Sequence, residues 1–277
     1  MVNLAICTVL CSMISIVMRL GRNRVSSTLN MMAVNYVTCI LVAGALMGFG
    51  NPLPQTDGLG LALGMGLVNG FLYVASFLLL QYNIQKSGVV LASVYSRISL
   101  IVPLIGSIFL YHEIPTVCQW IGFAVCVVAS VAMNEKDGSG GKFSLALPLL
   151  LLTDGAASIT AKIFNEAGNP ALSTNFLFYT FFAALLYCVI ASIAQKQRPN
   201  GWDLLYGVLL GLPNYFTSHF LLKALSEVPA VVVYPTRGVA SIALIALAGV
   251  LLFKERLSMR QWISIFAIAA ALVLLNL

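Results

Sequence analysis

Charged residues are scarce in this sequence: Lys, Arg, Asp and Glu together make up 9% of its 277 residues. A soluble domain carries about 25% charged residues, so the composition excludes an ordinary water-soluble fold. Hydrophobic residues make up 60% of the chain, and they gather in runs of about 18–25 residues, the length of a membrane-spanning helix. The strands of a membrane barrel have about 10 residues of alternating polarity instead. We therefore predict an all-α membrane protein.

Recognisable catalytic and metal-binding motifs are also missing. The sequence holds no P-loop, no HExxH, no GxSxG and no metal-ligand spacing. Its six cysteines lie in or beside apolar runs without a CxxC pair, as small buried hydrophobes do. The net charge of +6 comes mainly from cations in short loops and forms no basic patch for nucleic acid. These absences predict a protein that is not an enzyme, needs no metal or cofactor, and has lipid and a small molecule as partners.

Ten apolar segments are long enough to cross a bilayer. They cover residues 2–20, 29–49, 59–82, 88–111, 116–133, 143–162, 172–194, 203–224, 229–253 and 259–276. No basic stretch precedes the first segment and no small-residue cleavage site follows it, so we expect no cleaved signal peptide. The short loops and the absence of N-x-S/T sites fit a multi-pass protein of a bacterial plasma (inner) membrane, as a monomer or a homodimer.

The two halves of the chain resemble each other in sequence. A shift of 142 residues, from 112 to 254, brings "HEIPTVCQWI" onto "KERLSMRQWI". We therefore predict a first five-helix repeat at residues 1–135, a linker at 136–142 and a second five-helix repeat at 143–277. Because five is an odd number, the second repeat enters the membrane from the opposite side, which makes the pair an inverted-topology repeat.

Loop charges set the expected orientation. The odd-numbered loops hold eleven Lys and Arg residues, and the even-numbered loops hold two, Lys162 and Lys223. The positive-inside rule then places the odd loops in the cytoplasm and both termini outside. Glu113 and Glu255 end spans four and nine, and each is expected to cap the helix that follows it.

Two arginines, Arg97 and Arg237, lie inside the equivalent spans four and nine. Each is about eight or nine residues from one end of its span, so each lies roughly 12–14 Å deep. A charged Arg at that depth costs at least about 2.5–3.5 kcal/mol. A buried ion pair or helix-end carbonyls could satisfy one arginine, but two on repeat-related spans favour a shared water-filled cavity, where they would bind a carboxylate or phosphate.

Asp154 is the only acidic residue well inside a span, and Ser158 shares its helical face. It either neutralises an arginine or binds a proton or a substrate amine. His219 is the second candidate for coupling; its alternative role is a hydrogen bond between helices. The other candidates for substrate binding share helical faces with one another or align with Arg237. They are Asn69, Tyr73, Tyr95, Asn214, Tyr215, Tyr234 and Ser241.

Ten spans, an inverted repeat of five, and an acidic residue before "QWI" after spans four and nine resemble the drug/metabolite transporter superfamily, in its EamA-like branch. The resemblance covers the whole chain. It implies alternating access and a central cavity lined largely by spans 1, 3, 4, 6, 8 and 9. Triose-phosphate translocators of that superfamily use basic residues on spans four and nine, where Arg97 and Arg237 lie. Such carriers usually keep both termini inside, opposite to the orientation that the loop charges predict here.

We therefore expect a secondary active transporter for a small polar metabolite with an anionic group: an amino acid, an organic anion or a phosphate ester. Proton coupling through Asp154 is compatible with this function. The alternative is an exporter of lipophilic or cationic small molecules that uses Asp154 and tyrosines of the cavity. A channel would need a continuous polar stripe, and spans four and nine are too apolar away from their middle.

Overall fold

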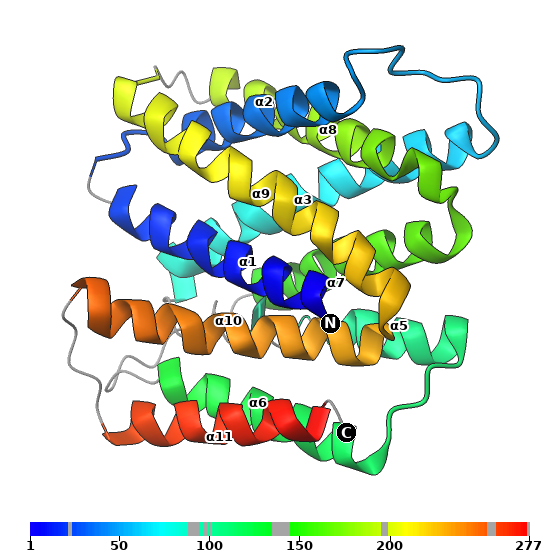
Figure 1. Ribbon diagram of the computed structural model, residues 1–277. Helices are drawn as coiled ribbons and strands as arrows, with labels where there is room; N and C mark the ends of the chain where they lie inside the picture. The colour runs from blue at the N-terminus through cyan, green and yellow to red at the C-terminus, as the bar shows by residue number, and fades with distance from the viewer. Residues whose placement is uncertain are drawn as a thin grey trace. The chain divides into compact units, whose positions relative to one another are not determined.

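The computed structural model describes residues 1–21, 24–87, 95–96, 99, 101–134, 145–194, 199–253 and 259–275. These residues form ten α-helices and one short 3₁₀ helix (Figure 1). The α-helices are α1 (Val2–Gly21), α2 (Thr28–Leu46), α3 (Leu59–Ser87), α5 (Ile101–Tyr111), α6 (Val117–Asn134), α7 (Ala146–Ala167), α8 (Ser173–Ala194), α9 (Gly201–Glu227), α10 (Ala230–Phe253) and α11 (Met259–Leu275); η1 (Pro170–Leu172) precedes α8.

Most helices begin and end within about five residues of the predicted spans. Span four is described as a helix only from Ile101 to Tyr111. Six helical segments are long and apolar enough to cross a membrane: Val2–Gly21, Thr28–Leu46, Leu59–Asn83, Ala146–Ala167, Pro170–Ala194 and Ala230–Leu252. The all-helical, membrane-type fold is therefore confirmed, and the ten-span inverted topology stays a prediction.

The described helices divide into two compact units, and each unit draws on both halves of the sequence. Unit 1 comprises Met1, 75–162 and 227–277, and unit 2 comprises 2–74 and 163–226. The division falls within α3 and within α7. Each compact unit therefore consists of helices from both halves of the chain. The sequence repeats at 1–135 and 143–277 divide the chain differently, and they stay a prediction.

In unit 2, small residues let the helices approach closely. α2 lies along α8 (Figure 1). A Cβ added at Gly70 of α3 would lie 2.4 Å from the Thr180 carbonyl oxygen of α8, and one at Gly211 of α9 would lie 2.4 Å from Cβ of Thr38 on α2. Side chains at these two glycines would push the helices apart. This is the packing that membrane helices use, because lipid supplies no hydrophobic force between them.

A buried carboxylate ties two loops of unit 2 together. Asp203, in the first turn of α9, has no exposed surface. It accepts hydrogen bonds from the backbone N–H and the hydroxyl of Ser26, both at 2.8 Å, and from the Asn200 N–H at 2.9 Å. The link between α1 and α2 is thereby fixed to the start of α9, where a negative charge also meets the positive end of the helix dipole.

In unit 1, α6 packs along α11, and α10 contacts α5, α6 and α11. One apolar cluster joins Ala129, Val239, Ile242 and Ala271. The α6 N-terminus carries a capping box: the Gln119 N–H donates to the Thr116 hydroxyl at 3.2 Å, and the Thr116 N–H donates to the Gln119 side chain at 3.0 Å. The cap expected from Glu113 at this helix is therefore supplied by other residues.

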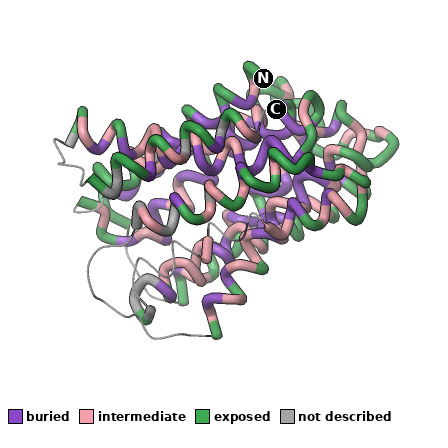
Figure 2. The backbone as a smooth tube through the Cα atoms, turned by 90° about the horizontal axis from the view of Figure 1, so that it is seen from below, coloured by how far each residue is buried: buried purple, intermediate pink, exposed green. Residues whose placement is uncertain are grey.

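Large apolar side chains remain exposed on helices of both units. Phe109 is 78% exposed, Ile193 is 71% and Leu251 is 76%. Exposed positions recur along the helices between buried ones (Figure 2). So much exposed apolar surface is exceptional for a protein in water, and hydrocarbon is the solvent that suits it.

Candidate functional site

Three polar residues form a stripe along α7 in unit 1. Asp154, Ser158 and Lys162 recur every four residues, so they share one face of the helix. Asp154 and Ser158 are half-buried, and Lys162 is only 1% exposed. Each position contacts a different part of the unit. The sequence predicted the first two residues of the stripe and missed the third, because it placed Lys162 in a loop.

Asp154 faces the described part of span four. Its Oδ2 lies 2.6 Å from the Ser99 hydroxyl and 3.3 Å from the Ser96 hydroxyl. The neighbouring Gly155 permits this approach, because a Cβ there would lie 2.8 Å from the Ser99 carbonyl oxygen. Tyr95, one of the predicted binding residues, is half-buried beside Ser96. Arg97 lies outside the described residues.

Tyr234 connects α10 to the middle of the stripe. It is fully buried, and its hydroxyl donates to the Ser158 carbonyl oxygen at 2.5 Å. Arg237 lies one turn further along α10, half-buried, with its guanidinium carbon 5.9 Å from the centre of the Tyr234 ring. Ser241 is buried and donates to the Gly238 carbonyl oxygen of its own helix at 2.8 Å. Unit 1 thus brings Tyr234 of α10 onto the stretch of α7 that carries Asp154.

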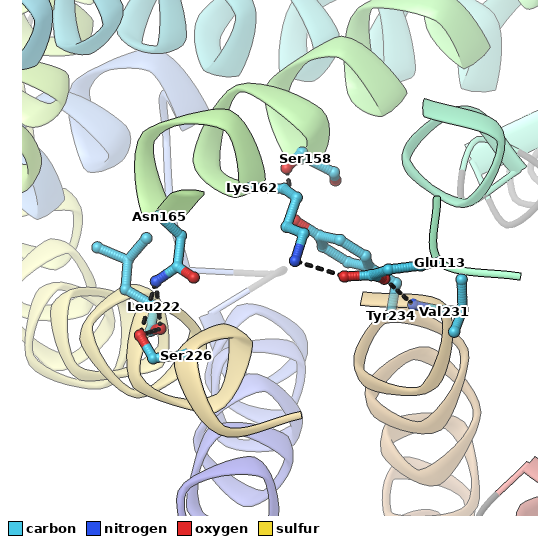
Figure 3. Close-up of polar contacts among 8 residues, drawn as sticks. All are labelled: Glu113, Ser158, Lys162, Asn165, Leu222, Ser226, Val231 and Tyr234. Carbon is cyan, nitrogen blue, oxygen red and sulfur yellow. Dashed lines mark hydrogen bonds and ion pairs between the residues drawn. The ribbon is translucent and has the colours of Figure 1, made fainter. Parts of the chain in front are cut away.

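Lys162 ends the stripe in a buried ion pair that sequence reasoning missed. Its ammonium lies 2.6 Å from Oε1 of Glu113, whose side chain is 16% exposed (Figure 3). Oε2 of the same carboxylate accepts the Val231 N–H of α10 at 3.3 Å, and the Tyr111 ring centre lies 5.3 Å from the ammonium. Glu113 therefore meets a helix N-terminus as expected, but that of α10 and not of the following helix.

The position of Lys162 in this pair also corrects the count of Lys and Arg residues in the even-numbered loops. α7 continues to Ala167, so Lys162 is a buried helical residue and not a loop cation. Of the two cations assigned to the even loops, Lys223 is exposed, near the end of α9. The signal that the sequence did offer was the spacing of Lys162, eight residues after Asp154 on the same helical face.

The remaining predicted residues lie in unit 2. Asn214 donates from Nδ2 to Oδ1 of Asn35 at 3.2 Å. Asn69 is 1% exposed, and its Oδ1 has no hydrogen-bond partner among the described residues. Tyr73 is half-buried. A buried amide oxygen of this kind is ordinarily met by water or a ligand, so Asn69 keeps its place as a candidate, and Asn35 joins it.

His219 of unit 2 lies in an aromatic row. Its ring centre is 6.1 Å from that of Tyr215 and 5.5 Å from that of Phe220. Tyr215 in turn lies 6.2 Å from Phe181, which lies 6.1 Å from Tyr36. The row joins α9, α8 and α2. It gives His219 an apolar and aromatic setting. This setting is compatible with both roles predicted for His219, a hydrogen bond between helices and coupling.

Another contact of unit 2 fixes the end of α7 to α9 (Figure 3). The Asn165 amide donates to the Leu222 carbonyl oxygen at 2.9 Å and to the Ser226 hydroxyl at 2.8 Å. Within the described part of the chain, no group of three or more His, Cys, Asp or Glu side chains could hold a metal ion.

Comparisons with known proteins agree with this membrane architecture. An uncharacterized protein of Haemophilus influenzae is 23% identical over 278 residues, which cover 95% of this chain and 94% of that protein. A crystal structure of another protein matches 99% of this chain and 94% of its own with a TM-score of 0.80 at 14% identity, which shows a shared fold. The sequence model of the EamA-like transporter family matches residues 2–134 and again residues 144–277. The two matches together span almost the whole chain, so the protein belongs to the EamA-like transporter family and is a multi-pass membrane transporter for a small molecule.

Proposed function

We propose that the protein is a secondary active transporter that moves a small polar metabolite with an anionic group by alternating access. The observation that carries the proposal is Arg237, a half-buried guanidinium eight residues into the apolar helix α10. At about 1.5 Å per residue it lies about 12 Å from the start of the helix, a depth from which its charge cannot reach either membrane surface. A charged side chain at that depth costs at least about 2.5–3.5 kcal/mol, and such residues ordinarily have a function.

The chemistry of the guanidinium favours an anionic substrate. Its planar fork matches a carboxylate or a phosphate bidentately. The Tyr234 ring beneath it is held in place by the bond to Ser158, so the ring can position the guanidinium. Arg97, on the repeat-equivalent span, is the second arginine in the proposed site. The substrate classes are an amino acid, an organic anion and a phosphate ester.

Alternating access is supported by the duplication. The family's sequence model matches each half of the chain separately. Five predicted spans in each half give the halves opposite orientations, the arrangement from which many secondary transporters build two alternately open states.

The test uses purified protein in proteoliposomes with radiolabelled lactate, alanine and glycerol phosphate. We expect uptake of at least one of the three, and we expect Arg237→Gln to reduce that uptake at least about tenfold, because one bidentate ion contact is lost. Arg24→Gln is the matched control, since Arg24 lies in the link between α1 and α2 and stacks on Trp202 of α9, 4.8 Å from its ring centre. Its uptake should equal that of the wild type.

Two results would contradict the proposal. One is uptake that Arg237→Gln leaves at the wild-type rate. The other is transport of a lipophilic cation, such as tetraphenylphosphonium, with none of the three anionic or zwitterionic probes moved. The second result would favour the exporter of cationic or lipophilic compounds, with Asp154 facing the substrate.

A further inference from the structure

One carboxylate joins three segments of unit 1. Glu113 follows the end of α5, its Oε1 lies 2.6 Å from the Lys162 ammonium of α7, and its Oε2 accepts the Val231 N–H of α10 at 3.3 Å (Figure 3). Lys162 lies near the end of α7, and Val231 is the second residue of α10. The Glu113 carboxylate therefore holds the start of α10 beside the end of α7.

The turn that presents Glu113 is strained. His112 has a φ of 54°, in the left-handed region that residues other than glycine rarely adopt. The His112 N–H donates to the Ile108 carbonyl oxygen at 3.1 Å, and the Glu113 N–H donates to that of Ser107 at 3.3 Å, so both carbonyl groups at the end of α5 are satisfied. Strained residues persist where the surrounding structure fixes them, and they gather at switch regions. The contacts of Glu113 with α7 and α10 are part of what holds this turn.

The first turn of α10, residues 230–234, is weakly tied to the rest of its helix. Pro235 lies inside α10 and has no N–H, so it cannot donate to the Val231 carbonyl oxygen one turn before it. One of the backbone bonds that would join the first turn to the next is therefore missing. Sharp bends in helices occur mostly at such prolines.

Contacts with other helices hold this first turn instead. The Tyr234 hydroxyl donates to the Ser158 carbonyl oxygen of α7 at 2.5 Å (Figure 3). Val231 and Val232 are buried and form an apolar cluster with Leu104 of α5. Together with the bond from Glu113, these contacts fix the first turn to α5 and α7, on the other side of the proline from the remainder of α10.

We propose that Glu113 and Lys162 form a latch that holds the first turn of α10 against α7, and that α10 bends at Pro235 when the latch opens. Arg237 lies two residues past the proline, with its guanidinium carbon 5.9 Å from the centre of the Tyr234 ring. A bend at the proline moves that ring relative to the guanidinium, so the latch controls the shape of the anion site. Opening of the latch is then a step of the transport cycle. This step rests on the proposed function, whereas the latch itself does not.

Hydrogen–deuterium exchange of the full-length protein in lipid nanodiscs tests the latch without any substrate. Glu113→Gln leaves one side-chain oxygen for two donors, the Lys162 ammonium and the Val231 N–H. The backbone amides of 230–234 should then exchange at least about tenfold faster, because a hydrogen bond to a charged acceptor is lost. The amides of 238–253, beyond the proline, should keep their wild-type rates. Glu227→Gln is the matched control; the Glu227 carboxylate lies just before α10, is 46% exposed and pairs with the N-terminal ammonium at 3.3 Å, and its loss should leave both sets of rates unchanged.

A second variant tests the bend. Pro235→Ala restores the missing N–H and joins the first turn to the rest of α10. Added to Glu113→Gln, it should slow the exchange of 230–234 again. Three results would overturn the latch: rates at 230–234 that Glu113→Gln leaves unchanged, an equal acceleration along the whole of α10, and an acceleration that Pro235→Ala does not reduce. The second result would show that α10 moves as one piece.

The step in transport is measured separately, in proteoliposomes with lactate, alanine and glycerol phosphate. Pro235→Ala should lower the uptake rate at least about threefold, because a continuous helix resists the bend and such hinges often set the turnover rate. Pro170→Ala is the matched control, since Pro170 is exposed in η1, and its uptake should equal that of the wild type. Uptake that Pro235→Ala leaves at the wild-type rate would overturn the step in transport and leave the proposed function standing. If none of the three probes is moved, the proposed function fails, and the exchange rates still decide whether the latch exists.

Discussion

Breaking the ion pair between Lys162 and Glu113 should destabilise the protein strongly, and removing both partners should not. The ammonium is 1% exposed and the carboxylate 16% exposed, with 2.6 Å between the charged atoms. Deleting one member of a buried pair costs about 3–5 kcal/mol, because the other charge remains buried without a counter-ion. Glu113 has some access to solvent and keeps its bond from Val231, so we expect about 3 kcal/mol for Lys162→Met. Glu113→Leu leaves the more buried charge and should cost at least as much.

The double variant Lys162→Met with Glu113→Leu tests the reasoning. A well-packed apolar pair is often as stable as the ion pair it replaces. The remaining loss is the cap on the Val231 N–H, about 1 kcal/mol. We therefore expect the double variant to be more stable than either single variant. The charge swap, Glu113→Lys with Lys162→Glu, should be less stable than the apolar pair, since it points an ammonium at the N-terminus of α10.

Equilibrium unfolding in mixed micelles with sodium dodecyl sulfate, followed by circular dichroism, measures these free energies. Wild type, both single variants, the double variant and the swap should be compared at one detergent composition. If the costs of the two single variants simply add in the double variant, the two groups are not coupled, and the reasoning is wrong. A swap as stable as the wild type would refute the part assigned to the α10 N-terminus.

Two further changes test the packing of unit 2. Asp203→Asn should lower the free energy of unfolding by about 1.5–3 kcal/mol, because hydrogen bonds to a charged acceptor are lost and an NH₂ group then faces backbone donors. Unfolding in mixed micelles measures this free energy. A change below the experimental error would contradict the view that Asp203 fixes the link between α1 and α2 to the start of α9. Gly70→Ala should cost about 1–3 kcal/mol, because the new Cβ would meet the Thr180 carbonyl oxygen at 2.4 Å. Gly64→Ala on the same helix is its control, since nothing lies within 4 Å of that Cβ and alanine is the better helix former, so this variant should lose no stability. Equal changes in stability in the two variants would contradict the packing argument.

Hydrophobic run length was enough to predict most of the described helices. α1, predicted at 2–20, is Val2–Gly21, and α10, predicted at 229–253, is Ala230–Phe253. Such runs are reliable because a chain in lipid must satisfy its backbone hydrogen bonds within each segment. The ends were less predictable. α7 runs five residues past its predicted end at 162, because the buried pair with Glu113 lets a charged residue continue the helix.

The candidate residues show where sequence reasoning stopped. The four-residue spacing correctly grouped Asp154 with Ser158 on one face of α7. It could not reveal Ser99, Glu113 or Asn35 as partners, because each of these meets its partner from a different helix or link.

The sequence by itself determined the solvent, the helices and the scarcity of internal charge, because these depend on composition and on residues close together in the chain. Tertiary structure decided which charge meets which group: Lys162 with Glu113 and the start of α10, Asp154 with two serines, and Asp203 with the link after α1. The physical reason is that a charge in a low-dielectric interior is governed by partners within about 4 Å. Such distances are set by the packing of segments far apart in the chain.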